Sequence, residues 1–155
     1  MPIEIRIQGL DAYNGKLQRV TVQMPATLQR LMVKSVIYAQ SQIPSYPAPP
    51  AGSKYRRTGS LGRVVTSFPG QSGGRSIGGG GGGGEAGVPL TRVEMMGKDV
   101  RGVIGGRLSY LPDVVGEGVQ ARVHRSRWWT LERVIKDARG GMAKIFRAGV
   151  IEMFK

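Results

Sequence analysis

Hydrophobic and polar positions alternate at the start of the chain. Ile3, Ile5 and Ile7 are separated by polar residues, and Gly9 follows them. A period of two residues is typical of a half-buried strand, because successive side chains of a strand point to opposite faces of the sheet. The pattern therefore predicts a short first strand that ends at Gly9.

After Leu10 the spacing of apolar residues lengthens to three and four positions, which is the spacing of one face of a helix. The clearest part of this stripe consists of Leu28, Leu31, Met32, Ser35 and Ala39. Pro25 suits the first turn of a helix, because its missing amide hydrogen is not needed there. We expect a main helix from about Pro25 to Gln42 and a looser helical stretch before it.

The segment 44–58 is rich in proline and basic residues. Its prolines are Pro44, Pro47, Pro49 and Pro50. Proline fixes φ and removes a backbone donor, so this segment is predicted to be an extended loop. The next segment, Leu61 to Phe68, is β-branched in its middle, and this composition is typical of a strand. We expect that strand to end at Pro69-Gly70.

Glycine dominates the segment 70–87, with 11 glycines in 18 positions and seven in succession from Gly78 to Gly84. An ordered glycine costs more backbone entropy than any other residue, so we predict a flexible surface loop or the tip of a hairpin. The tract matches the G-x-G-x-x-G pattern only as any polyglycine run would. Val88-Pro89-Leu90 does not open a helix after it, and no Gly-Lys-Ser/Thr completes a phosphate loop.

Short strands are predicted after the glycine tract. Leu90 to Met96 and Val100 to Ile104 flank Gly97-Lys98-Asp99, which suits the turn of a hairpin. A third strand is expected from Arg107 to Leu111, just after two glycines.

The last part of the chain has a helical pattern again. Thr130 is a suitable N-cap, and the carboxylate of Glu132 suits the positive end of the helix that follows. Apolar residues continue at helical spacing almost to the C-terminus, while Gly140-Gly141 in the middle is expected to weaken or bend the helix.

The order of these elements predicts the fold class. A strand, a helix, several strands and a final helix favour an α+β domain with a largely antiparallel sheet. We expect the long helix of the N-terminal half and the C-terminal helix to pack on that sheet, with the glycine-rich segment as a long loop. The 155 residues are enough for a single domain, 1–155, with one core.

Charge is the most informative property of the composition. Lys and Arg total 23 and Asp and Glu total 10, which gives a formal charge of +13. Such an excess indicates acidic partners, such as nucleic acid or acidic protein surfaces. The basic residues are distributed over Lys54–Arg63, Arg92–Arg107 and Arg122–Arg139 rather than concentrated on one helix that would enter a major groove.

The sequence gives little support to catalysis or to a cofactor. Cysteine is absent and His124 is the only histidine, so disulfides, thiolate metal sites and a zinc site are excluded. His124 lies among arginines without a neighbouring carboxylate to orient it, and a small hydrolase that uses His124 is a minor alternative. No run of about 18 apolar residues is present, so we expect no membrane partner and a soluble protein of the cytoplasm.

Two groups of residues are candidates for binding. Lys54, Arg56 and Arg57, with Arg63 close behind, either contact an acidic partner or form a solvated loop. Trp128-Trp129, beside Arg125 and Arg127, either stack on bases or anchor the start of the last helix in the fold.

Two blocks of sequence resemble a known family. The segment from Pro49-Pro50 to Arg63, with Thr58-Gly59-Ser60-Leu61 at its centre, is similar to a block in small tail-completion or head–tail-joining proteins of tailed bacteriophages, which are neck and tail-terminator-like proteins. The segment Gly105–Leu111, with Gly116-Glu117-Gly118 and a basic, histidine-containing loop after it, looks like that family's second block. A closing helix completes the resemblance.

The resemblance implies a structural role in the neck or upper tail of a virion that is assembled in the host cytoplasm. Such subunits form a ring, expected to be a hexamer, that completes the tail tube and joins it to the head connector around the genomic DNA, which is bound without sequence preference. In this interpretation Thr58-Gly59 forms a turn and Leu61 anchors the next strand. The interface or DNA-channel candidates are Lys54, Arg56, Arg57, Thr58, Gly59, Leu61, Arg63, Tyr110, Arg122, Arg125, Arg127, Trp128 and Trp129.

The hypothesis that follows is a structural protein and not an enzyme, with no cofactor and no metal. Its partners are other copies of itself, the head connector and tail tube proteins, and nonspecific DNA. A nucleic-acid-binding protein without sequence preference is the alternative, supported by the net charge and by the mixed arginines and tryptophans from Arg125 to Trp129.

Overall fold

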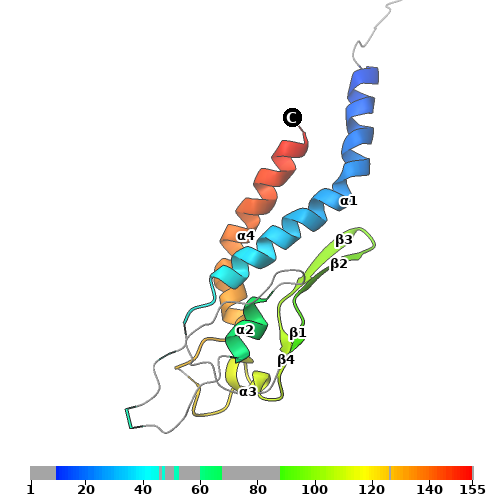
Figure 1. Cartoon of the computed structure of the whole chain (residues 1–155). Helices are drawn as coiled ribbons and strands as arrows, with labels where there is room; N and C mark the ends of the chain where they lie inside the picture. Colours follow the sequence, from blue (N-terminus) through cyan, green and yellow to red (C-terminus); the bar gives the residue numbers. More distant parts are fainter. Residues whose placement is uncertain are drawn as a thin grey trace, which may run out of the picture.

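The computed structural model describes residues 10–45, 47, 51–52, 60–67, 88–125 and 127–154. The helices are α1 (Leu10–Ser41), α2 (Ser60–Thr66), α3 (Leu111–Val115) and α4 (Leu131–Met153). The strands are β1 (Val88–Pro89), β2 (Arg92–Met96), β3 (Asp99–Val103) and β4 (Gly106–Arg107). Figure 1 shows α1 and α4 as two long helices that lie side by side, with the shorter elements gathered at one end. The predicted α+β class is confirmed.

Helix α1 is longer than predicted, because it runs from Leu10 to Ser41 without interruption and contains Pro25 in its interior. Proline cannot donate to the carbonyl of Thr21 four residues earlier, and its ring crowds that carbonyl, so a bend is expected at this position. Figure 1 shows α1 changing direction in its first half. The looser stretch predicted before Pro25 is therefore regular helix on the far side of a bend.

The predicted strand from Leu61 to Phe68 is wrong, because Ser60–Thr66 form the helix α2. Leu61, Val64 and Val65 are all buried, and their spacing of three and four residues places them on one face of a helix. The Thr66 hydroxyl donates to the carbonyl of Gly62 at 2.7 Å, which satisfies an acceptor near the helix end. Burial of one helical face has overridden the β preference of Val64-Val65-Thr66. Leu61 anchors a helix and not a strand.

The predicted hairpin is confirmed as the antiparallel pair β2–β3. Met96 is opposite Asp99, and the turn residue Gly97 has a φ of 63°, a conformation that favours glycine. Helix α1 packs on this hairpin so closely at Gly102 that an added Cβ would lie 2.6 Å from Cγ2 of Val36. The hairpin therefore lies against α1, as Figure 1 also shows.

The strand predicted from Arg107 to Leu111 is largely wrong. Only Gly106–Arg107 are extended, as β4, which pairs with β1 in a second antiparallel ladder. Leu111 begins helix α3, and Pro112 lies in its first turn, where proline is already in the helical conformation. The described strands thus form two short ladders rather than one broad sheet.

The C-terminal helix begins as predicted. The Thr130 side chain accepts a hydrogen bond from the backbone N–H of Arg133 at 3.2 Å, and Glu132 lies in the first turn. Helix α4 continues unbroken through Gly140 and Gly141, so the expected weakening does not interrupt it. Instead, Gly141 and Gly149 face α1, where a Cβ on either residue would overlap the side chain of Tyr38 or Leu31.

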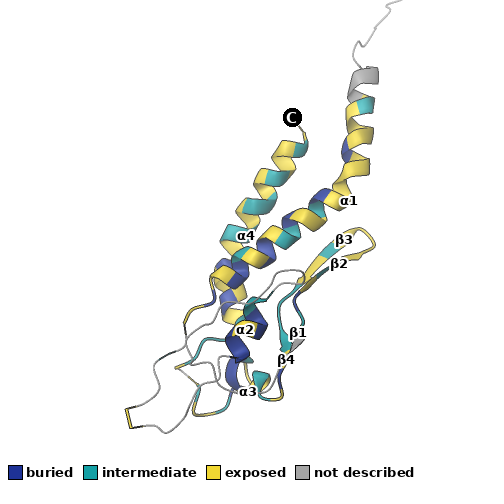
Figure 2. Cartoon of the chain, viewed as in Figure 1, coloured by how far each residue is buried: buried dark blue, intermediate teal, exposed yellow. Residues whose placement is uncertain are grey.

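The main core lies where α2, α3 and the start of α4 meet. Its buried members are Ile43, Leu61, Val64, Val65, Leu108, Val114, Val115 and Val134. Figure 2 shows these elements in the colour of buried residues, whereas the first half of α1 and the far end of α4 are largely exposed. The aliphatic side chains of this cluster therefore hold together segments that are far apart in the sequence.

Several predictions lie outside the described residues. They concern the strand over Ile3–Gly9, the glycine-rich loop 70–87, and most of the proline-rich loop 44–58, including Lys54, Arg56 and Arg57 and the turn Thr58-Gly59. In the part of the chain that the structure describes, no helix is long and apolar enough to cross a membrane.

Candidate functional site

The loop between α3 and α4 carries the predicted arginine and tryptophan residues, and buried polar contacts fix its path. The side-chain amide of Gln120 donates to the carbonyl of Val114 at 2.6 Å and, over a longer distance of 3.4 Å, to that of Trp128. The Nε of Arg125 donates to the carbonyl of Gln120 at 2.9 Å. Gln120 is 6% exposed, so these bonds form in an environment where an unpaired amide would be costly.

Trp128 and Trp129 are half-buried and pack against the main core. The ring of Trp128 also meets His124 edge to face, with centroids 4.8 Å apart and an interplanar angle of 62°. This packing supports the interpretation of the two tryptophans as anchors at the start of α4, because much of each indole surface is already covered.

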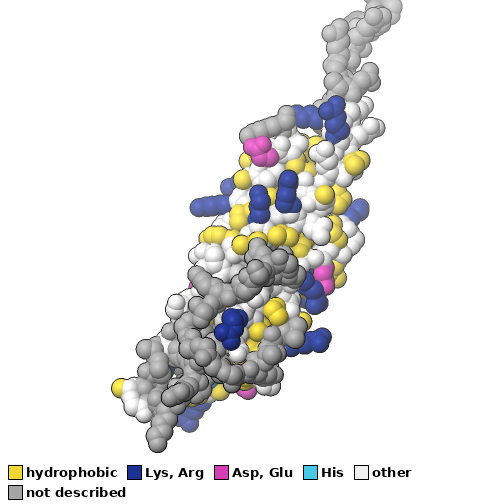
Figure 3. Space-filling model, in the orientation of Figure 1, with side chains coloured by type: hydrophobic (Ala, Val, Ile, Leu, Met, Phe, Trp, Pro, Cys, Tyr) yellow, Lys and Arg dark blue, Asp and Glu magenta, His cyan; other side chains and the backbone are white. Residues whose placement is uncertain are grey.

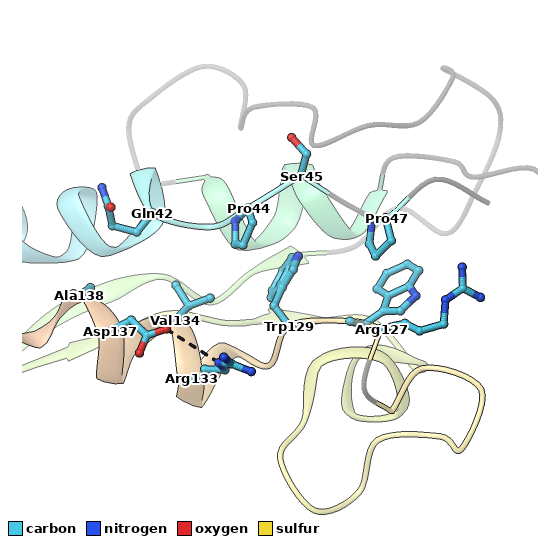
Figure 4. A pocket seen from close by; sticks show the side chains of 11 residues that line it. Gln42, Pro44, Ser45, Pro47, Arg127, Trp129, Arg133, Val134, Asp137 and Ala138 are labelled. Carbon is cyan, nitrogen blue, oxygen red and sulfur yellow. Dashed lines mark ion pairs between the residues drawn. The ribbon is translucent and has the colours of Figure 1, made fainter. Parts of the chain in front are cut away.

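A pocket of about 520 Å³ opens beside these tryptophans. One side is formed by the segment after α1, and the other by the first turns of α4. Figure 4 shows Pro44 and Pro47 across the pocket from Val134, with the ring of Trp129 between the two sides. The pocket residues are Gln42, Pro44, Ser45, Pro47, Arg127, Trp128, Trp129, Arg133, Val134, Asp137 and Ala138. We call this set the tryptophan pocket.

The lining of the tryptophan pocket is apolar and polar in similar parts, and its charged residues face solvent. Val134 and Ala138 are 6% and 2% exposed and contribute its buried part. Arg127, Arg133 and Asp137 are exposed. The Arg133–Asp137 pair has a separation of 3.9 Å with both side chains well exposed, so its stabilisation is weak. The dashed line in Figure 4 marks this pair.

The structure brings together only part of the residues that the sequence singled out. Arg127, Trp128 and Trp129 line the tryptophan pocket, and Arg125 supports the loop behind it. Leu61 is 5% exposed, so it is a core residue and not part of a surface. Tyr110 is half-buried against the same core at the start of α3.

The two remaining described candidates lie on the surface, apart from the tryptophan pocket. Arg63 is exposed on α2, and Arg122 is exposed on the loop between α3 and α4. Figure 3 shows lysine and arginine side chains spread over the visible face with few carboxylates between them. The exposed positive charge is therefore distributed over several elements, as the sequence indicated.

The surroundings of His124 differ from those of a catalytic histidine. Among the described residues its buried Nδ1 has no hydrogen-bond partner, whereas a triad histidine donates from this atom to a carboxylate. Its ring packs edge to face against Trp128. Within the described ranges there is also no group of three or more His, Cys, Asp or Glu residues that could hold a metal ion.

Sequence reasoning missed the half of the pocket that follows α1, and it missed Arg133 and Asp137. The sequence predicts Pro44 and Pro47 only as part of an extended loop, because nothing local indicates that they face residues near position 130. The buried Gln40 was also missed. Its position directly after Ala39, at the end of the apolar stripe of α1, was the one available signal.

Comparison with known proteins gives no matching family model, no matching curated protein and no matching solved structure.

Proposed function

We propose that this protein is a structural subunit of a tailed-bacteriophage virion. In this proposal the chain forms a ring, with six copies expected, in the neck or upper tail. The ring completes the tail and joins it to the head connector around the DNA channel. The proposal assigns no catalytic step and no cofactor to the chain.

The observation that carries the proposal is the distribution of positive charge. Exposed lysines and arginines occur on α1, α2, β3, the loop before α4 and α4 itself. Charge spread in this way attracts phosphates without reading bases, which suits a subunit beside passing DNA. The closing helix of the family resemblance is also present, as α4, whereas helix α2 takes the place of the strand that the resemblance implies at Leu61.

A sequence-nonspecific nucleic-acid-binding protein that acts alone is the second candidate. The arginines next to Trp128 and Trp129 favour it, because aromatic rings beside guanidinium groups bind single strands. The packing of both tryptophans against the core weighs against it, since a stacking platform needs an open ring face.

Negative-stain imaging of the purified full chain tests the proposal. Closed rings of uniform diameter are the expected result. Particles of monomer size that bind single-stranded DNA tightly at low salt, and release it as salt rises, would favour the second candidate. A chain that binds one DNA sequence tightly even at high salt would contradict both.

A further inference from the structure

The tryptophan pocket has the chemistry of a peptide-binding site. Its volume of about 520 Å³ lies in the range of ligand pockets in proteins, roughly 300–1,000 Å³. Prolines on one side and tryptophans beside them offer apolar surface with few degrees of freedom, so little side-chain entropy is lost when a ligand covers them. The pocket is therefore suited to one or two apolar side chains of a bound segment.

The charges at the pocket select among peptides. Arg127 and Arg133 contribute two guanidinium groups against the single carboxylate of Asp137. Because the Arg133–Asp137 pair is solvent-exposed at 3.9 Å, Arg133 can turn to a ligand carboxylate at small cost. Guanidinium groups form paired hydrogen bonds with carboxylates, so an acidic ligand is favoured.

We propose that the tryptophan pocket binds an acidic segment of a partner protein, in which apolar side chains enter the pocket and neighbouring Asp or Glu residues meet Arg127 and Arg133. This inference deepens the proposed function and rests on it for the choice of a virion protein as the partner. The binding chemistry itself requires no ring.

A second copy of this chain does not fit the pocket equally well. Its 10 acidic residues are outnumbered by 23 basic ones, and no two acidic residues lie within three positions of each other. A copy therefore offers no segment with closely spaced carboxylates. Charge complementarity points to a different, acidic protein.

The chain contains a built-in reporter, because it has 2 tryptophans and both line the pocket. We suggest titrating the full chain with the tryptophan-free peptide acetyl-Asp-Leu-Glu-Phe-Asp-amide and following intrinsic tryptophan fluorescence. We expect a saturable change in tryptophan fluorescence with this peptide. The matched peptide with Asn and Gln in place of the acidic residues should bind at least about tenfold more weakly, because its charge-assisted hydrogen bonds are lost.

Variants of the chain locate the binding. The double variant Arg127→Glu with Arg133→Glu should bind the acidic peptide at least about tenfold more weakly. Lys144→Glu reverses the charge of an exposed residue further along α4 and should change affinity by no more than about twofold. Circular dichroism of each variant checks that the fold is retained.

The outcomes separate this inference from the proposed function. No saturable response to the acidic peptide, or an equal response to its uncharged match, would overturn the inference. A ten-nucleotide oligo-dT is the competing ligand. If it binds tightly, displaces the acidic peptide and no longer binds the double variant, the ligand of the pocket is nucleic acid and the inference is overturned. If peptide binding behaves as expected while imaging finds no rings, the pocket assignment stands and the ring proposal fails.

Discussion

Two regions of the molecule are stabilised in opposite ways. One is the main core around α2 and α3, which we call the lobe, and the other is the pair of helices α1 and α4. In the lobe, Val65 and Val115 are 0% and 1% exposed, and bulky aliphatic side chains fill the interior. Along the helix pair, Gly141 leaves room for Tyr38 of α1, and Gly149 leaves room for Leu31 of α1. The lobe therefore depends on the volume of its side chains, and the helix pair on the absence of volume at selected positions.

Hydrogen bonding separates the two regions as well. The buried Nε2 of Gln40 shares its two hydrogens among three acceptors, the carbonyls of Val65 and Ser67 at 2.9 and 3.1 Å and the hydroxyl of Thr91 at 3.2 Å. These contacts join the end of α1 to α2 and to the residue before β2. In the helix pair the buried hydroxyl of Ser35 has no such partner among the described residues. In the described part of the chain, the buried side-chain hydrogen bonds that join distant segments are thus found at the lobe and not along the helix pair.

The largest effect should come from removing volume in the lobe. Leu61→Ala deletes a buried side chain from the core, and we expect unfolding free energy to fall by about 3 kcal/mol. Urea unfolding measures this loss. Val22→Ala is the control, because Val22 is 80% exposed and its truncation should change stability by less than about 0.5 kcal/mol. Equal losses for the two variants would contradict the described core.

The next effect tests the polar link between α1 and the lobe. Gln40→Ala leaves the carbonyl of Val65 and the hydroxyl of Thr91 short of a donor in a buried place, so we expect a loss of about 2 kcal/mol. Gln29→Ala, at an exposed position of α1, is the matched control and should be nearly neutral. A neutral Gln40→Ala in the same urea experiment would show that the amide does not join these segments.

Adjacent glycines of α4 allow a test in which the sign of the effect changes. Gly141→Ala places a methyl group against Tyr38 and should destabilise the chain by about 1–2 kcal/mol. Gly140 has nothing near its missing Cβ, so Gly140→Ala should stabilise the helix by about 0.5–1 kcal/mol. Thermal unfolding of both variants decides the matter. Two stabilising substitutions would mean that α1 and α4 do not approach as described.

The smallest effect concerns His124. His124→Ala removes the edge-to-face contact with Trp128, and we expect a stability loss of about 0.5–1 kcal/mol with assembly unchanged. Stability is read from thermal unfolding, and assembly from the particles seen in the electron microscope. Loss of assembly in a variant that still folds normally would give His124 a role beyond packing.

The elements that could be predicted were those with long patterns or distinctive turn chemistry. Three local patterns predicted elements that the fold contains. They are the apolar stripe from Leu28 to Ala39, the N-cap at Thr130 and the glycine turn at Gly97. Helix α2 has only seven residues, too few for a period to compete with its β-branched composition. Its helical form is determined by burial of Leu61, Val64 and Val65 in a core to which distant segments contribute, and local sequence does not encode that packing.

The candidate site was predictable on one side only. Arg127, Trp128 and Trp129 stand out by composition, but Pro44 and Pro47 join them through tertiary packing between segments distant in sequence. Leu61 illustrates the converse, since a residue singled out by the family resemblance is buried in the core. Residue type indicated which side chains are unusual, and only the fold determined which of them share a surface.

The mass of the assembly that the purified full chain forms decides whether the protein is a ring subunit. Native mass spectrometry at low ionic strength should give one dominant species whose mass is an integral multiple of 16.7 kDa, with six copies expected. Dilution should leave this species unchanged, because a closed ring has no free ends from which subunits are easily lost. A chain that remains at the monomer mass at every concentration would contradict the account of a ring-forming structural subunit.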